Sequence, residues 1–305
     1  MAVKILTDST SDLTPETAGK LGVTVVPVYV RFGDKVYRDG VDITQEEFYL
    51  KMTSSPIHPT TSQPSPADFA EAYGRLAKET DEIISIHLST KVSGTYESAL
   101  RGRELAPARC RIEVVDSASV SMGLGLEVMA AARIAKVGES LQHVLDELKD
   151  AIQNTRIFGV LDTLKYLSMG GRLGKAKALL GTLLNVKAML TMRDGEIVPA
   201  GLARTRGKGL DRLFDIVKGA LNVQELALVP STDVPEAVSF KERLSSILSM
   251  ERIHIARLGP ALGAHAGPGT LLMAFREKLG SVIEDSGKKG FSLHSIRLPR
   301  NLPRR

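Results

Sequence analysis

Residues 82–117, EIISIHLSTKVSGTYESALRGRELAPARCRIEVVDS, decide the fold class of this chain. The stretch opens with a short apolar run at 82–89, continues through a helical pattern at 93–105, and closes with a second apolar run at 111–117. Short runs rich in Ile and Val between polar turns are typical of buried strands. A helix between two such strands favours a parallel sheet of the α/β class.

The same alternation extends through the rest of the N-terminal half. We predict further strands at 3–9 and 23–33, the latter broken by Pro27, and helices at 43–52, 67–79, 119–138 and 140–155. Three cap signals mark helix starts: a Thr44 and Glu47 capping box, Ser65 followed by Pro66, and Ser140. We therefore expect residues 1–154 to form one domain around a doubly wound, mainly parallel sheet.

The second half has a different pattern. Residues 186–204 predict a hairpin that turns at Asp194-Gly195, a strong short-range turn signal. Further strands are predicted at 225–231, 252–259 and 270–275, and helices at 205–221 and 235–248. We therefore expect residues 155–279 to form an α+β domain that contains antiparallel strands.

The basic charge of the chain lies mainly in its last residues. The formal net charge is +5, and residues 286–305 contain six Lys and Arg residues and no acid. The remainder holds 34 basic and 35 acidic residues, so we expect no nucleic-acid groove on the folded body. Segment 280–305 is expected to be a disordered basic tail, suited at most to a transient contact with an anionic membrane surface.

Composition indicates a globular cytoplasmic protein. Hydrophobic residues make up 43% of the 305 residues, but no apolar run approaches the ~20 residues of a membrane helix. The N-terminus lacks the build of a signal peptide. Cys110 is the single cysteine, which excludes an internal disulfide framework and a multi-cysteine metal site.

Polar residues follow the ends of three predicted strands. They are Asp8 to Ser11, Ser89-Thr90 leading to Ser93, and Asp116-Ser117 leading to Ser119 and Ser121. Ligands of open α/β sheets bind at the carboxyl ends of the strands. We therefore expect a ligand site at this edge of the first sheet.

Residues 58–66, HPTTSQPSP, admit three interpretations: a solvated linker, a helix cap, or a set of hydroxyls that holds a ligand. Ser65 already fits the cap, which leaves Thr60 to Ser62 without a structural role. Thr61 and Ser93 both stand close to helix starts, where free backbone amides attract anions. Such groups could hold a carboxylate without a buried cation, although Ser and Thr before helices are usually caps.

Motifs of several enzyme classes are missing. No serine lies in G-x-S-x-G, the GGRLGKAK segment at 170–177 lacks the spacing of a phosphate loop, and no H-E-x-x-H pair is present. We predict no catalytic residue and no metal site. The GPALGAHAGPGT segment at 259–270 contains one histidine in a predicted glycine loop, which is either a core residue or a ligand-binding or acid–base group.

Seven motifs together resemble the DegV family, in the family's order and over residues 3 to about 279. They are TDSTSDL, PTTSQPSP, LSTKVSGTYESA, VVDSASVSMGLG, YLSMGGRLG, LLNVKAMLTMRDGEI and LGAHAGPGT. The resemblance implies a two-domain protein that holds one long-chain fatty acid. It also implies a partner, the ATP-binding subunit of a bacterial fatty-acid kinase, which phosphorylates the bound carboxylate for phospholipid synthesis.

The resemblance also implies roles for particular residues. The carboxylate ligands correspond to Thr61 and Ser93 with Gly94, and the histidine of the H-x-G-P-G loop corresponds to His265. Two arginines are expected to face the partner: Arg204 and Arg172, the latter in the GGR segment. The chain departs from the family pattern at Ala264 and Ala266, where Thr residues often flank the histidine.

Three functions compete at this point. The first is a lipid-binding subunit that needs no cofactor other than its fatty-acid ligand. The second is a stand-alone phosphotransfer enzyme that uses His265 as a base or phosphoryl acceptor, and the third is a lipid-responsive sensor. An unperturbed histidine titrates near pH ~6.5, so protonation of His265 is expected to balance the charge of a bound carboxylate.

Overall fold

The first sheet forms the core of the N-terminal half. The computed structural model describes residues 2–106, 109–180 and 186–278. The strands of this sheet are β1 (Lys4–Asp8), β2 (Val23–Val26), β6 (Glu82–His87) and β7 (Arg111–Asp116). They run parallel in the order β2-β1-β6-β7, which confirms the parallel sheet predicted from the alternation of strands and helices.

The described residues of this half form one 3₁₀ helix and six α-helices. They are η1 (Ser9–Ser11), α1 (Pro15–Leu21), α2 (Gln45–Ser54), α3 (Pro66–Leu76), α4 (Thr95–Glu104), α5 (Met122–Lys136) and α6 (Leu141–Asn154). Thr44 and Glu47 form the predicted capping box of α2, and Ser65 forms one with Asp68 at α3. Ser140 accepts a hydrogen bond from an amide in the first turn of α6, as predicted.

Helices cover both faces of the first sheet. On one face, Phe69 and Tyr73 of α3 pack with Ile83 of β6. On the other face, Leu124 of α5 packs with Ile84 of the same strand, because successive strand residues point to opposite faces. The doubly wound arrangement is thereby confirmed.

The second sheet belongs to the C-terminal half and is mostly antiparallel. Its strands are β8 (Thr155–Leu161), β9 (Lys187–Arg193), β10 (Glu196–Ala203), β11 (Val223–Pro230), β12 (Ile253–Ile255) and β13 (Leu271–Glu277). The order is β10-β9-β8-β13-β11-β12, and only the β11–β12 pair is parallel. Asp194 (φ 51°) and Gly195 (φ 76°) form the predicted hairpin turn, since both positive angles suit a two-residue hairpin loop.

The remaining elements of this half surround the second sheet. They are α7 (Lys165–Met169), η2 (Gly174–Leu179), α8 (Arg206–Gly219), α9 (Val234–Leu244), η3 (Met250–Arg252) and α10 (Pro260–Ala266). Leu213 of α8 and Phe240 of α9 pack on one face of the sheet with Phe275 of β13. The opposite face is turned toward the N-terminal half.

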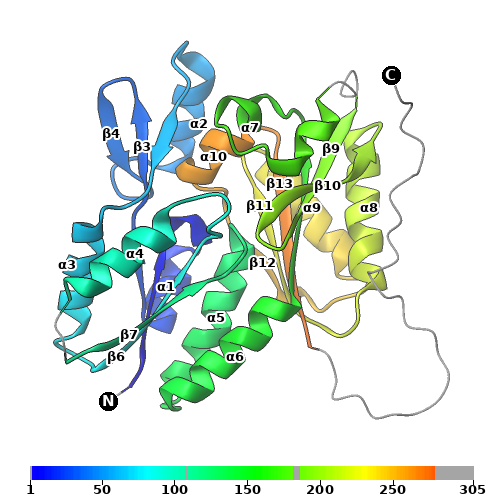
Figure 1. The fold of residues 1–305 in the computed structure, drawn as a ribbon. Coiled ribbons are helices and arrows are strands. Elements are labelled where there is room, and N and C mark those ends of the chain that lie inside the picture. The colour runs from blue at the N-terminus through cyan, green and yellow to red at the C-terminus, as the bar shows by residue number, and fades with distance from the viewer. Residues whose placement is uncertain (1, 107–108, 181–185, 279–305) are drawn as a thin grey trace, which may run out of the picture.

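Helix α5 joins the two halves. Leu124 and Val128 belong to the core beneath the first sheet, whereas Leu126 and Met129 pack with Ala227 and other residues of the second sheet. Figure 1 shows α5 and α6 between the two sheets, at the base of the molecule. A helix that is apolar nearly all round is expected at such a position, because it buries more than one face.

A small third sheet corrects two expectations. The run at 23–33 was predicted as one strand broken by Pro27, but it forms β2 of the first sheet and β3 (Tyr29–Phe32) of another sheet. The third sheet has the order β4-β3-β5, with β4 at Lys35–Arg38 and β5 at Thr60–Ser62. The interpretation of Thr60 to Ser62 as a segment without structural role was therefore wrong, because these residues pair with β3.

Three smaller differences concern the C-terminal half. The strand predicted at 252–259 is limited to Ile253–Ile255, and His265 lies in the last turn of α10 rather than in a glycine loop. A 3₁₀ helix, η2, follows α7.

Among the described residues, no helix has the length and apolarity that a bilayer crossing requires. The basic segment 280–305, with its predicted disorder, lies outside the described residues.

Candidate ligand-binding site

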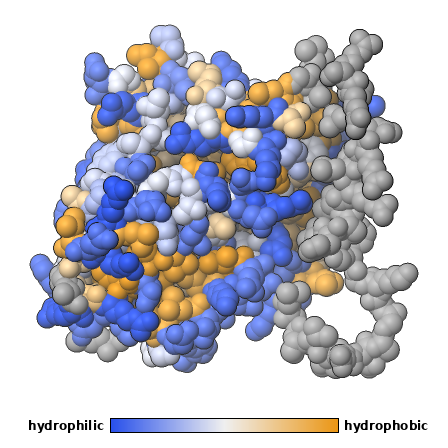
Figure 2. Space-filling view, viewed as in Figure 1, coloured by the Kyte–Doolittle hydropathy of each residue, from blue (hydrophilic) through white to orange (hydrophobic). Residues whose placement is uncertain are grey.

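A cavity lies between the two halves of the molecule. Its empty volume is about 1000 Å³, a figure that includes open solvent at its mouth. The N-terminal half contributes lining residues from η1, β5 and the loops after β6 and β7, and the C-terminal half contributes β8, β9, β10, α10 and β13. Figure 2 shows hydrophobic side chains at the centre of one face, where the two halves meet.

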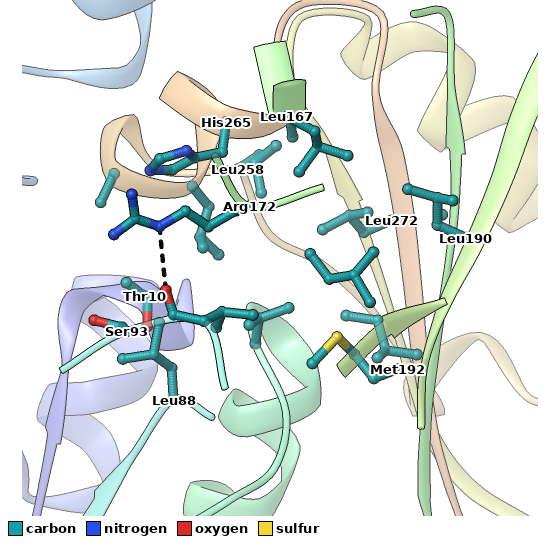
Figure 3. A pocket seen from close by; sticks show the side chains of 18 of the residues that line it. Thr10, Leu88, Ser93, Leu167, Arg172, Leu190, Met192, Leu258, His265 and Leu272 are labelled. Carbon is teal, nitrogen blue, oxygen red and sulfur yellow. Dashed lines mark hydrogen bonds between the residues drawn. The ribbon is translucent and has the colours of Figure 1, made fainter. Parts of the chain in front are cut away.

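The polar residues of the cavity wall are unevenly distributed. Most of the lining is aliphatic, from Val28, Leu88, Val92, Val120, Ile157, Leu161, Leu167, Leu190, Ile197, Leu258, Leu262 and Leu272. In Figure 3, Ser93, Arg172 and His265 lie toward one end, and Leu190, Met192 and Leu272 toward the other. A cavity with one polar end and a long apolar remainder fits an elongated amphipathic ligand.

Thr61 and His265 meet at the polar end. The Thr61 Oγ1 and His265 Nε2 atoms are 2.8 Å apart, and both residues are half-buried. Thr61 comes from β5, and His265 comes from the last turn of α10. Two residues 204 positions apart in the chain are thus joined by one hydrogen bond.

The surroundings of His265 keep its imidazole neutral. Its Nδ1 atom is buried and has no hydrogen-bond partner among the described residues. A methyl group added at Gly170 would overlap Nδ1, so the ring lies directly against the glycine backbone. Burial, with smaller contributions from the charges of Arg172 and His58, lowers the pKa of His265 to about 4. The expectation that His265 titrates near pH ~6.5 was therefore wrong for the ligand-free protein.

Arg172 closes the edge of the cavity. Its Nε donates to the carbonyl oxygen of Val92 (3.3 Å) and its Nη1 to that of Gly170 (2.8 Å), so the side chain bridges the two halves (Figure 3). The residue is nevertheless exposed at this position. Arg172 therefore lies at the rim of the cavity, where its guanidinium faces solvent.

Ser93 stands opposite the Thr61–His265 pair, just before α4. Its hydroxyl lies 2.9 Å from Thr95 Oγ1 and accepts a weaker bond from the Thr95 amide (3.3 Å). The next residue, Gly94, has no side chain, and a Cβ there would lie 2.7 Å from Nε2 of Gln63. Gly94 thus leaves room for Gln63, which lets the Thr61 strand approach Ser93.

Most of the other polar residues at strand ends do not line the cavity. Thr90 instead bonds through its hydroxyl to Asp116 (2.7 Å), and Ser89 donates to the Gly195 carbonyl of the β9–β10 hairpin (2.7 Å). Of the strand-end groups singled out in the sequence, Thr10 and Ser93 line the cavity. Ser89, Thr90 and Asp116 instead fasten the loops and the hairpin around it.

Comparison with known proteins gives the family. A family model described as an uncharacterised protein of the DegV family matches residues 2–278. The chain belongs to the DegV family. A DegV domain-containing protein of Deinococcus radiodurans is 38% identical over 281 residues, which cover 90% of this chain and 98% of that protein.

Solved DegV structures share the fold. One, titled as fatty acid binding of a DegV family protein from Thermus thermophilus, is 36% identical with a TM-score of 0.84, and covers 91% of this chain and 100% of that one. Another, DegV from Bacillus subtilis, titled as a fatty acid binding protein, is 30% identical with a TM-score of 0.81 and has the same coverage. The α/β architecture with two main sheets is therefore a DegV fold.

Sequence reasoning did not single out several residues of this DegV site. Gln63 and Gly170 were not recognised, because their roles depend on what packs against them. Thr10 was noted only as one of a run of strand-end polar residues, yet it lines the cavity. Arg204 is exposed between β10 and α8, as expected, but it does not line the cavity.

Proposed function

We propose that this DegV protein binds one long-chain fatty acid, with its carboxylate at the Thr61–Ser93 end and its acyl chain in the aliphatic part of the cavity. The observation that carries the proposal is the separation of polar and apolar lining within one cavity. The Thermus and Bacillus relatives, which are described as fatty acid binding, support the same ligand class.

Neutral donors hold the carboxylate in this proposal. The hydroxyls of Thr61 and Ser93, which line the cavity, hold the head group, the amide of Gly94 follows directly after Ser93, and His265 lies behind Thr61. Within the described lining, Arg172 is the one cationic residue, and it lies exposed at the rim. Hydroxyl and amide donors avoid the cost of burying an unpaired cation before the ligand arrives.

The hydrogen bonding of His265 fixes the direction in which Thr61 donates. A proton on Nδ1 would be a buried donor without a partner, and such donors are rare and costly. We therefore assign the proton to Nε2, which donates to Thr61 Oγ1. The Thr61 hydroxyl then has its own proton free for a carboxylate oxygen.

We further propose that the bound carboxylate is presented to a separate ATP-binding kinase subunit, which forms the acyl phosphate for phospholipid synthesis. Arg172 at the cavity rim and Arg204 between β10 and α8 are both exposed. A rigid, exposed guanidinium fork suits recognition of carboxylates or phosphates on a partner surface.

Ligand identity is tested first. The purified protein is denatured and extracted with organic solvent, and the extract is analysed by mass spectrometry. We expect about one long-chain fatty acid per protein chain, because the proposed site lies in one cavity with one polar end. An extract free of fatty acid, together with no binding of added oleate, would contradict the proposal.

Presentation to the kinase is tested separately, by measuring acyl-phosphate formation at saturating lipid with a reconstituted kinase subunit. We expect Arg204→Ala to retain lipid affinity and lose kinase-dependent turnover. His265→Ala is expected to lose turnover more strongly than affinity. Turnover of ATP by this chain alone would instead support the stand-alone enzyme, and equal losses of affinity and turnover would contradict the separate roles.

A further inference from the structure

We propose that Asp12 and Asp39 are positioning residues that fix helix α10 and thereby place His265 against Thr61. The proposal deepens the proposed function, because it rests on His265 belonging to the fatty-acid site. It also gives a role to the TDSTSDL motif at 7–13, most of which does not line the cavity.

Helix α10 cannot cap its own N-terminus. Its N-cap residue is Gly259, which has no side chain, and its first residue is Pro260, which has no amide hydrogen. Most helices satisfy their first amides with a Ser, Thr, Asp or Asn at the N-cap. The amides of Gly259 and Ala261 therefore need acceptors from another part of the chain.

The two aspartates supply those acceptors. Asp12 Oδ1 accepts from the Gly259 amide (2.9 Å), and Asp39 Oδ2 accepts a longer bond from the Ala261 amide (3.4 Å). Ser121 Oγ holds the other oxygen of Asp12 (2.5 Å), and Ser9 Oγ donates to Asp39 (2.9 Å). Both carboxylates come from the N-terminal half, whereas α10 belongs to the C-terminal half.

The packing around Gly259 leaves no room for another arrangement. A Cβ at this position would lie 2.9 Å from Asp12 Oδ1 and 3.4 and 3.5 Å from the two oxygens of Asp39. The glycine therefore permits the backbone to approach both carboxylates at once. Asp12 is 7% exposed and Asp39 is 4% exposed, so water competes little for these bonds.

Hydrogen bonding is the main interaction available to these carboxylates. Neither forms an ion pair within residues 2–106, 109–180 and 186–278. Burial raises the pKa of Asp39 to about 7 and the pKa of Asp12 well above its usual range. Two such groups are costly to bury, and their common partner, the start of α10, accounts for their position.

A fixed N-terminus fixes the other end of the helix. His265 is only six positions after Gly259, a rise of about 9 Å along a rigid helix. At the far end, a Cβ at Gly267 would overlap the ring of Tyr166, and the His265 ring lies against Gly170. A shift of α10 at the aspartates would therefore move His265 away from Thr61 and out of its buried position.

The test follows the imidazole of His265 by NMR in ligand-free protein that contains ¹³C-labelled histidine, with His265→Gln to assign the signal. In the unaltered protein we expect titration near the pKa of about 4. Asp12→Ala and Asp39→Ala should expose the ring and move its pKa toward the ordinary value of ~6.5. Asp12→Asn and Asp39→Asn keep an acceptor oxygen and should keep the low pKa.

Affinity for oleate is then measured in the same variants. We expect each alanine variant to bind about tenfold more weakly, which corresponds to ~1.4 kcal/mol, and each asparagine variant to bind nearly as well as the unaltered protein. Glu225→Gln is the matched control: Glu225 is 6% exposed in its side chain and bridges α5 to the second sheet, but it contacts neither α10 nor the cavity. It should lower stability without changing the His265 titration or the affinity.

Folded alanine variants with an unchanged His265 titration would overturn the proposal, as would a loss of affinity in Glu225→Gln equal to theirs. If an alanine variant fails to fold, Gly259→Ala takes its place, since its methyl group pushes against Asp12 Oδ1 and should give the same shift. A shifted titration in a protein that binds no oleate would support the positioning role and reject the proposed function.

Discussion

At the scale of single residues, the site depends on contacts between backbone and side chain that leave no room for an extra atom. The His265 ring packs on the backbone of Gly170, and the amide of Gln63 packs where Gly94 lacks a Cβ. These two contacts bring the Thr61 hydroxyl and the Ser93 hydroxyl to the same end of the cavity. The hydroxyls provide the hydrogen-bond donors, and the glycines allow the close packing that positions those donors.

The hydroxyl donors are expected to contribute directly to affinity. Thr61→Val and Ser93→Ala each remove one hydrogen bond to a charged group, worth ~1.5–3 kcal/mol, so oleate affinity should fall roughly ten- to a hundredfold. Thr60→Val is the matched control, because Thr60 lies on the same strand but is exposed and outside the cavity lining. Titration calorimetry measures all three variants, and an unchanged affinity in both site variants would reject this carboxylate site.

Gly170 is expected to control the position of His265. In Gly170→Ala the new methyl group displaces the imidazole and breaks its hydrogen bond to Thr61, so oleate affinity should fall by about tenfold. Gly74→Ala, in the interior of α3 where a Cβ meets nothing, should bind normally and be slightly more stable. Equal affinity of the two variants would show that His265 tolerates displacement.

At the scale of elements, α5 has the largest structural role. One of its faces belongs to the core under the first sheet, and the other packs on the second sheet. The first turn of the same helix follows Ser121, whose hydroxyl holds Asp12. Ser121 at the start of α5 thus contacts Asp12, Asp12 caps α10, and α10 lines the cavity.

Truncation of α5 at its contact with the second sheet is expected to destabilise the whole protein. Leu126 is fully buried, so Leu126→Ala should cost about 2–5 kcal/mol through lost apolar contact and the cavity left behind. Leu50→Ala on α2 is the control, since that side chain is 71% exposed and should change the free energy of unfolding by less than ~0.5 kcal/mol. Urea unfolding followed by circular dichroism compares them, and similar midpoints would contradict the role of α5.

At the scale of the whole molecule, an ionic cluster joins the halves near the start of β11, at the opposite end of that strand from α10. Arg133 of α5 makes a two-bond contact with Glu225 of β11 (2.9 and 2.8 Å), and Arg276 of β13 adds two further bonds (3.2 and 3.1 Å). Burial would raise the pKa of Glu225, but its contacts with His254, Arg133 and Arg276 outweigh burial and lower the pKa to about 2. The cluster therefore stabilises the ionised form of Glu225.

This cluster predicts a particular dependence on pH. A depressed carboxylate pKa contributes stability above the unfolded value of 4.5, and that contribution is lost as pH falls toward about 2. At pH 7, Glu225→Gln should lower the free energy of unfolding by about 1–3 kcal/mol. The difference from the unaltered protein should shrink on acidification below about pH 4.5.

Glu71→Gln is the control for that experiment. Glu71 forms an exposed i,i+4 pair with Arg75, which contributes little to stability at any pH. Denaturant titrations over a pH series give the free energies. A Glu225→Gln difference that stays constant on acidification would show that the cluster does not depend on the charge of Glu225.

Sequence patterns were enough to predict the class of the fold and many of its elements, although β4, β8 and α10 were not predicted. Local patterns carry that information: the alternating apolar runs gave the first sheet, the capping residues Thr44, Ser65 and Ser140 marked helix starts, and Asp194-Gly195 marked the hairpin. Each signal is complete within a few neighbouring residues, so no distant contact is needed to read it. The motifs that resemble the DegV family also brought Thr61, Ser93 and His265 together before any geometry was known. The domain limits and the ligand roles of these residues stay predictions.

The contacts that position these residues form only in the folded chain. Nothing local distinguishes a strand broken by Pro27 from two strands that join different sheets, because the partner strands are distant in sequence. The neutral state of His265 follows from burial against Gly170, and the caps of α10 come from Asp12 and Asp39, more than 200 residues away. Burial, close packing and capping across the two halves are properties of the folded chain, so no short stretch of sequence could reveal them.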